Sequence, residues 1–191
     1  MNPPPKRPNT DRRSREYLTP AEIDRLIAAA RRLGRHGHRD ATMILLAYRH
    51  GLRVSELVNL RREQLDLRQG LLHVRRRKNG MPSTHPLRGP ELRALRQALH
   101  AYSETAYVFV SERGAPMTAA TFHKLVARAG EAARLGLPIH PHMLRHSTGF
   151  KLAHDGQDTR AIQHYLGHRN IQHTVLYTRL DASRFNDFWP D

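Results

Sequence analysis

The chain has 191 residues and no cysteine, which fits a single domain and excludes disulfide scaffolds, thiolate zinc sites and cysteine nucleophiles. No apolar stretch approaches the roughly 20 residues of a membrane span, and residues 1–16 hold no apolar export signal, so we expect a cytoplasmic protein without a membrane partner. The formal net charge of +15 favours nucleic acid as the partner, because bound arginine and lysine release counterions from its backbone.

The N-terminal segment, residues 1–16, contains three consecutive prolines followed by basic and polar residues, and it is too poor in apolar side chains to form a core. We expect a flexible basic arm with these phosphate-binding cations: Lys6, Arg7, Arg12 and Arg13. The folded domain is expected to span residues 17–180. Its first helix is predicted by Thr19 as the cap, Pro20 at the first position and Glu22 completing a capping box.

Hydrophobic periodicity predicts a mainly helical fold beyond this first helix. A second helix is expected at about 39–50, ended by Gly51, and a short one at 54–60. Alternating apolar residues at 64–87, with turns at Gln69-Gly70 and Asn79-Gly80, predict a small antiparallel sheet. Further helices are expected at 90–102, 118–135, 141–154 and 158–167. The expected fold class is therefore mainly α with one small antiparallel β-sheet.

The C-terminal half carries two motifs suited to phosphate chemistry, although each also has a plain structural explanation. His142 and Arg145 stand one helical turn apart and share a face, and Arg145 can bind two phosphate oxygens at once. A solvated basic helix face would give the same pair. His168 follows Gly167 at a predicted helix end, where an imidazole either reaches a ligand or caps the helix. Neither motif decides the function alone.

Taken together, these motifs resemble the tyrosine recombinases and phage integrases. Five residues stand in the order and local spacing of that family: Arg53, His142, Arg145, His168 and Tyr177. Three longer segments, 83–87, 140–146 and 158–178, are similar to the small recombinases that invert the promoter switch of type 1 fimbriae. The resemblance covers residues 17–189 and implies the fold of a tyrosine recombinase catalytic domain.

The resemblance also implies a mechanism that uses no metal or other cofactor. Arg53 and Arg145 would clamp the charge that grows on the non-bridging phosphate oxygens. Tyr177 would attack the phosphate, leaving a 3′-phosphotyrosyl bond and a free 5′-hydroxyl. His168 matches the family position that hydrogen-bonds the scissile phosphate, and His142 would act as a base or as a phosphate contact.

A lysine on a β-hairpin turn protonates the departing 5′-oxygen in this family, and Lys78, beside Asn79-Gly80, matches it. An ammonium group gives up a proton more readily than a guanidinium, which suits this role. The usual Gly-Lys-Gly pattern is absent, and a plain DNA contact is the alternative for Lys78. The neighbouring cations are expected to contact DNA: Arg75, Arg76 and Arg77. Glu56 and His146 are expected to support the site.

The partners implied by the resemblance are double-stranded DNA at paired inverted-repeat sites, further copies of the chain forming a tetramer on DNA, and DNA-bending accessory proteins, which would place the protein at the nucleoid. Many family members carry a separate N-terminal domain that closes around DNA, whereas this chain begins about sixteen residues before the catalytic domain. The tail at 181–191 is rich in aromatic residues and either docks on a neighbouring protomer or packs on its own domain.

Several alternatives to a promoter-inverting recombinase stay open at this point. A non-catalytic transcriptional regulator would share the charge and the helices, a type IB topoisomerase would share the chemistry, and an integrase or excisionase of a mobile element would share both. Zinc binding by His142 and His146 is disfavoured, because no glutamate lies between them to act as a base and Arg145 would repel a cation.

Overall fold

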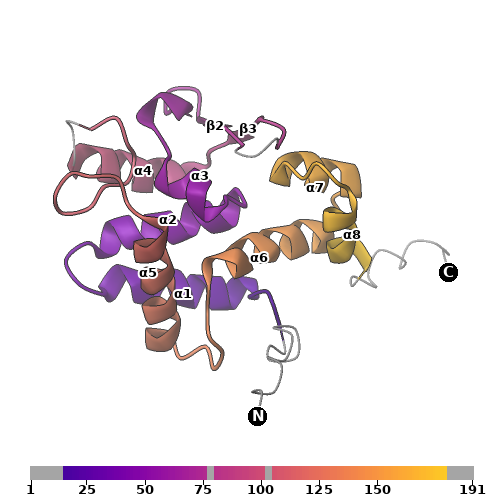
Figure 1. The fold of residues 1–191 in the computed structure, drawn as a ribbon, viewed down its shortest axis with the longest axis horizontal. Helices are drawn as coiled ribbons and strands as arrows, with labels where there is room; N and C mark the ends of the chain where they lie inside the picture. The colour runs from indigo at the N-terminus through magenta and orange to yellow at the C-terminus, as the bar shows by residue number, and fades with distance from the viewer. Residues whose placement is uncertain (1–14, 77–79, 102–104, 180–191) are drawn as a thin grey trace, which may run out of the picture.

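The structure, a computed structural model, describes residues 15–76, 80–101 and 105–179. The cations of the expected basic arm, Arg77, Lys78 and the tail at 181–191 lie outside these ranges. In the part of the chain that is described, helices dominate and a single small sheet lies at one edge, so the expected fold class is confirmed (Figure 1).

A bundle of helices forms the larger part of the fold. Its members are α1 (Pro20–Arg32), α2 (Gly37–Arg49), α3 (Val54–Val58), α4 (Gly89–Ala101), α5 (Ala119–Ala132) and α6 (Pro141–His154). The predicted capping box is present at the start of α1, where the Thr19 hydroxyl accepts from the Glu22 amide and the Glu22 carboxylate accepts from the Thr19 amide. Gly51 ends α2 with a φ of 56°, a conformation that favours glycine. The apolar faces of these helices enclose one large core.

The sheet has three antiparallel strands in the order β1 (Leu65–Asp66), β2 (Leu71–Val74) and β3 (Ser83–Pro86). A 3₁₀ turn, η2 (Arg62–Gln64), leads into β1. Leu72 pairs with His85 and Val74 with Ser83 in the β2–β3 register. The alternation of buried and exposed residues along β2 places Leu72 and Val74 on the core side.

Two further helices, α7 (Thr159–Leu166) and α8 (Gln172–Arg179), pack on the C-terminal half of α6 and form a second, smaller core (Figure 1). Asp158 caps α7 and Gly167 ends it in the left-handed conformation, as the sequence predicted. α8 was not predicted. No helix among residues 15–76, 80–101 and 105–179 has the length and apolar character needed to cross a membrane.

Candidate active site

One surface pocket brings together residues from four separate parts of the chain. The residue before α3 is Arg53, α6 contributes Arg145 and two histidines, the loop after α7 contributes His168, and α8 contributes Tyr177. Among the residues that line it are Arg53, His142, Arg145, His146, His168 and Tyr177. The five residues singled out from the family spacing therefore meet at one place, although they span more than 120 positions of sequence.

Arg145 lies at the floor of this pocket and is only 1% exposed. Its Nη1 donates to the Gly51 carbonyl, and its Nη2 donates to the Leu166 carbonyl at 2.6 Å. Burial, together with the nearby charges of Arg53 and Arg76, lowers the pKa of Arg145 to about 9, so it stays charged at neutral pH. A guanidinium has five N–H bonds, so three of them remain for a phosphate oxygen.

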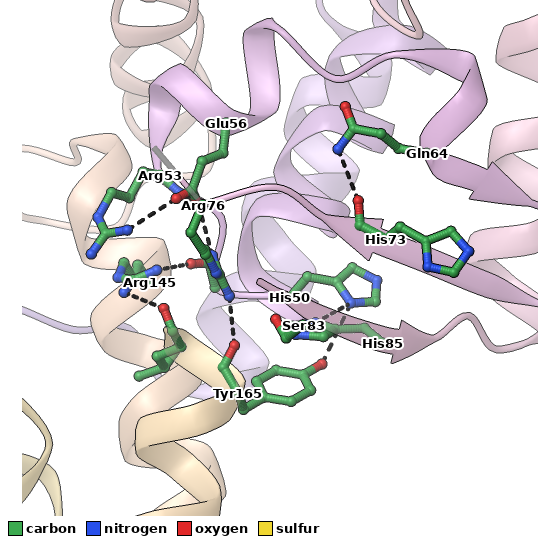
Figure 2. Close-up of polar contacts among 12 residues, drawn as sticks. His50, Arg53, Glu56, Gln64, His73, Arg76, Ser83, His85, Arg145 and Tyr165 are labelled. Carbon is green, nitrogen blue, oxygen red and sulfur yellow. Dashed lines mark hydrogen bonds and ion pairs between the residues drawn. The ribbon is translucent and has the colours of Figure 1, made fainter. Parts of the chain in front are cut away.

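A buried carboxylate holds Arg53 at the edge of the pocket. The Glu56 side chain is 1% exposed and accepts from the Arg53 main-chain amide and from Arg53 Nη1, both at 2.9 Å. Its Oε2 also accepts from Arg76 Nη1 at 2.7 Å, as Figure 2 shows. Hydrogen bonds between charged groups are short and strong, so this carboxylate restricts the orientation of both guanidinium groups.

Arg76 has a different environment from the expected DNA contact. Its side chain is 0% exposed, and its second nitrogen, Nη2, donates to the Tyr165 carbonyl at 2.5 Å. Arg75 does lie at the surface, with a side chain that is 67% exposed and paired with Glu63 at 2.7 Å. Of the cluster expected to bind DNA, Arg75 is thus accessible to a phosphate in this arrangement and Arg76 is not.

Tyr177 is 2% exposed and lies on α8, with its ring packed against α6. Its ring packs edge-on against Phe150 at 5.2 Å between centroids, and its hydroxyl lies 3.1 Å from His146 Nδ1. Burial raises the pKa of Tyr177, and the charge of Arg145 offsets part of this. Desolvation lowers the pKa of His146 to about 4, so at neutral pH the imidazole is uncharged and can accept the phenol hydrogen.

His142, expected to act as a base or as a phosphate contact, lies beside His146 and not beside the tyrosine hydroxyl. The two imidazoles meet edge to face with centroids 4.4 Å apart, and His142 is exposed at the pocket mouth. Partial desolvation and then the charge of Arg145 lower the pKa of His142. This position suits a contact with a phosphate oxygen better than proton transfer from Tyr177.

His168 is held through one ring nitrogen and presents the other to the pocket. Its Nδ1 lies 2.8 Å from the Thr174 hydroxyl, which leaves Nε2 for a ligand. Desolvation lowers the pKa of His168 to about 3, so the imidazole is neutral. Its ring lies nearly parallel to that of Tyr177, with centroids 6.3 Å apart.

Comparison with known proteins decides the family. The model of the phage integrase family matches residues 16–184. The chain belongs to this family. Type 1 fimbriae regulatory protein FimB of Escherichia coli strain K12 is 44% identical over 184 residues, which cover 94% of this chain and 92% of FimB. FimE of the same strain is 44% identical over 181 residues, covering 92% and 91%.

Recombinases of known structure share the fold. The crystal structure of XerA recombinase is 28% identical with a TM-score of 0.79, covering 92% of this chain and 65% of that one. XerH site-specific recombinase bound to difH, at 20% identity and a TM-score of 0.78, matches in fold alone. The chain spans about two thirds or less of these solved chains. Tyrosine recombinase XerC of Pseudomonas aeruginosa is 40% identical over 151 residues, which cover 75% of this chain and 48% of XerC. Together with the family match and the identity to FimB and FimE, this similarity shows that the chain is a tyrosine recombinase.

Two features of this family member's site were missed by sequence reasoning. The contact between His146 and the Tyr177 hydroxyl depends on how α8 packs on α6, and α8 was not predicted. The buried position of Arg76 carries only one sequence signal: it comes two residues after Val74, so it continues the alternation of buried positions beyond the end of β2. Lys78, the expected proton donor, lies outside the described residues.

Proposed function

We propose that this protein cuts and rejoins double-stranded DNA at paired inverted-repeat sites and thereby inverts a promoter segment, such as one controlling fimbriae. One observation carries the catalytic part. The Tyr177 hydroxyl is hydrogen-bonded to the neutral imidazole of His146, and both side chains line a pocket that also contains two arginines and a second neutral histidine. The inversion rests on the identity to FimB and FimE over more than nine tenths of both chains.

The cleavage step forms one bond and breaks one. Tyr177 Oη attacks the phosphorus, and the bond to the 5′-oxygen breaks, leaving a 3′-phosphotyrosyl linkage and a 5′-hydroxyl. Negative charge grows on the non-bridging oxygens, which Arg53 and Arg145 bind. Both cations are fixed before DNA arrives, by Glu56 and by two main-chain carbonyls, so little reorganisation is needed during the reaction.

The phenol proton leaves toward His146. Because burial raises the pKa of Tyr177, a free phenolate is scarce near neutral pH, and the proton must depart as the phosphorus–oxygen bond forms. The neutral His146 at 3.1 Å is placed to accept it. His142 and His168 then serve as hydrogen-bond partners of the phosphate, and Lys78 supplies the proton that the 5′-oxygen takes up. Rejoining is the same step in reverse.

Assembly on DNA follows from the requirements of strand exchange. Inversion needs two sites and two cuts at each, so four copies of the chain act together, with DNA-bending proteins bringing the sites near one another. Structural neighbours include the Tn1549 transposon integrase in complex with transposon right end DNA and a lambda integrase dimer bound to a core site. The +15 charge supports duplex DNA as the substrate here.

A suicide substrate tests the proposal. The protein is incubated in EDTA with a nicked duplex carrying an inverted repeat from next to its own gene, and SDS-resistant adducts are counted. Wild type and Tyr48→Phe, a matched change of a half-buried tyrosine in α2, are expected to form the adduct, and Tyr177→Phe is not. Specific binding without any adduct would favour a non-catalytic regulator.

A further inference from the structure

The hydrogen of a neutral imidazole sits on one of its two ring nitrogens, and its place decides what His168 can offer a phosphate. With the hydrogen on Nε2, the ring donates toward the pocket. With the hydrogen on Nδ1, Nε2 would present a lone pair to a negatively charged oxygen. Burial and then the charge of Arg145 lower the pKa of His168 to about 3, so the ring is neutral and one of these two tautomers is present. The partner of Nδ1 therefore determines whether His168 can bind a phosphate.

The hydroxyl of Thr174 is that partner, at 2.8 Å from Nδ1. Thr174 is 0% exposed, so water does not reach the hydroxyl. Within the part of the chain that the structure describes, His168 is the hydroxyl's one hydrogen-bond partner. A buried donor left without an acceptor is costly, so the hydroxyl hydrogen is directed at the ring. Nδ1 then accepts this hydrogen bond, and Nε2 carries the hydrogen of the imidazole.

Two other buried threonines show why this hydroxyl can act as a donor to the ring. Thr42 Oγ1 donates to the His38 carbonyl at 2.7 Å, and Thr148 Oγ1 donates to the Leu144 carbonyl at 3.1 Å. In each case the acceptor lies four residues earlier in the same helix, and the bond uses the hydroxyl hydrogen. Thr174 makes no such bond among the described residues, so its hydrogen is not taken by the main chain of α8.

The main chain of His168 is held separately from its ring. Its amide donates to the Gln163 carbonyl at 3.0 Å, and the buried Gln163 side chain donates to the His168 carbonyl at 3.0 Å. These bonds fix the backbone, while the orientation of the ring depends on what the ring contacts. Thr174 stands three residues before Tyr177, so both side chains share a face of α8. The hydroxyl therefore connects the ring of His168 to the helix that carries the nucleophile.

Resting on the proposed contact between His168 and the scissile phosphate, we propose that Thr174 is a positioning residue whose hydroxyl donates to His168 Nδ1 and holds the ring in the Nε2–H tautomer. The threonine itself touches neither DNA nor the reacting atoms. A ring that could rotate or change tautomer would direct its N–H at the phosphate for only part of the time. Donors that are oriented before the reaction are the ones that stabilise the developing charge.

Nitrogen NMR of the protein without DNA tests the tautomer directly. Long-range correlation spectra of a nitrogen-15 sample separate protonated from unprotonated ring nitrogens, and the His168 signals are identified by their loss in His168→Gln. At pH 7.5 we expect the hydrogen on Nε2 in wild type and in Thr174→Ser. The Nδ1 signal should shift in Thr174→Val, which lacks the donor, and stay in place in Thr42→Val. A hydrogen on Nδ1 in wild type would overturn the inference.

Cleavage rates test whether the hydroxyl acts through the histidine. Single-turnover adduct formation is followed on the nicked duplex, where the amplitude reports the folded fraction and the rate constant does not depend on it. Thr174→Val keeps the shape of the side chain and is expected to be slower by about tenfold, the effect of one lost hydrogen bond. Thr174→Ser should restore the wild-type rate. Thr42→Val, a buried change in α2 outside the pocket, should leave the rate unchanged.

A second background separates positioning of His168 from support of the helix. In His168→Ala, adding Thr174→Val should slow the reaction no further, because residues that act through one another are not additive. An equal slowing with and without His168 would show that Thr174 supports α8 and Tyr177 instead, and would overturn the inference. A wild-type rate in Thr174→Val would overturn it as well. Loss of adducts in every protein, wild type included, would remove the proposed cleavage and the catalytic role of Thr174, while the NMR spectra would still decide the tautomer.

Discussion

Arginine supplies the positive charge of the pocket, and burial determines how that charge is used. Arg145 donates two of its N–H bonds to main-chain carbonyls, and Arg53 is paired with a carboxylate that is itself buried. Both groups are therefore oriented before a phosphate binds. A lysine at either position would keep the charge but lose the planar arrangement of donors.

The contact between His146 and Tyr177 predicts a specific order of effects. His146→Ala is expected to slow single-turnover adduct formation by about a hundredfold, the lower range for loss of a general base, while DNA binding stays intact. His123→Ala, a change on the exposed face of α5, should have no effect. If the rate of adduct formation is unchanged in His146→Ala and falls only in His142→Ala, the base is His142 and not His146.

Buried neutral histidines predict how stability depends on pH. The pKa of His85 is lowered to about 3 by desolvation and by the neighbouring His50 and Arg76, while an unfolded histidine has a pKa of about 6.5. Below pH 6.5 the unfolded chain therefore binds more protons than the folded one, and stability falls as pH falls. His146 and His168 act in the same direction.

We expect the free energy of unfolding to fall between pH 6.5 and 5, by at most about 1.4 kcal/mol per pH unit for each such histidine. Denaturant unfolding at several pH values measures the slope. His85→Gln should reduce this slope relative to wild type, whatever it does to stability at pH 7.5. A slope that stays the same in this variant would show that His85 is protonated in the folded protein.

The junction of α6 and α8 depends on a glycine that gives space to the nucleophile. A Cβ on Gly149 would lie 2.5 to 2.6 Å from three ring atoms of Tyr177. Gly149→Ala is expected to shift the tyrosine and lower adduct formation at least about tenfold with DNA binding retained. Gly130→Ala in α5 is the control, since its Cβ would meet Ile139 at 2.5 Å, outside the pocket. Equal losses of cleavage per folded molecule in both variants would contradict this.

Helices with local end signals were predictable from sequence. Thr19, Asp158 and Gly167 mark the ends of α1 and α7 through hydrogen bonds within a few residues, and the structure confirms each of them. α8 has eight residues and few apolar side chains, and its sequence carries no local signal for a helix. The helix is stabilised instead by its packing on α6 and α7. Nonlocal contacts were correspondingly the ones missed.

The same division holds for the candidate site. The motif spacing resembled that of the family and so predicted that Arg53, Arg145 and Tyr177 belong to one site. The structure brings these residues together in one pocket. It did not show which histidine meets the tyrosine hydroxyl, nor that Arg76 is buried, because both depend on the fit between separate helices and the sheet.

At the scale of the whole molecule, the pocket lies where two cores meet. The larger core includes residues of α1 to α6, the smaller one joins the end of α6 to α7 and α8, and Arg145 hydrogen-bonds Gly51 on one side and Leu166 on the other. The residues of the pocket are thereby divided between two packed units. A change in how these units meet would alter the distance between Arg53 and Tyr177.

The basic N-terminal segment predicts a salt effect on DNA binding. Each phosphate contact contributes roughly 0.9 to the slope of log affinity against log salt concentration. Removing residues 1–13, which include Lys6, Arg7, Arg12 and Arg13, is expected to reduce the slope by about 2 to 4 on duplex DNA. Removing only residues 1–5, which hold no lysine or arginine, should leave it unchanged. An unchanged slope in the longer deletion would show that these cations do not contact phosphate.

The most direct test of covalent catalysis is the identity of the residue joined to DNA. The trapped adduct is digested with nuclease and trypsin, and the peptide that carries a nucleotide is sequenced by mass spectrometry. Trypsin cuts after Arg169 and Arg179, and the peptide 170–179 contains Tyr177 as its sole tyrosine. We predict a 3′-phosphonucleotide on Tyr177 in this peptide. A nucleotide on any other residue, or a cleaved site without a linked peptide, would contradict the central claim.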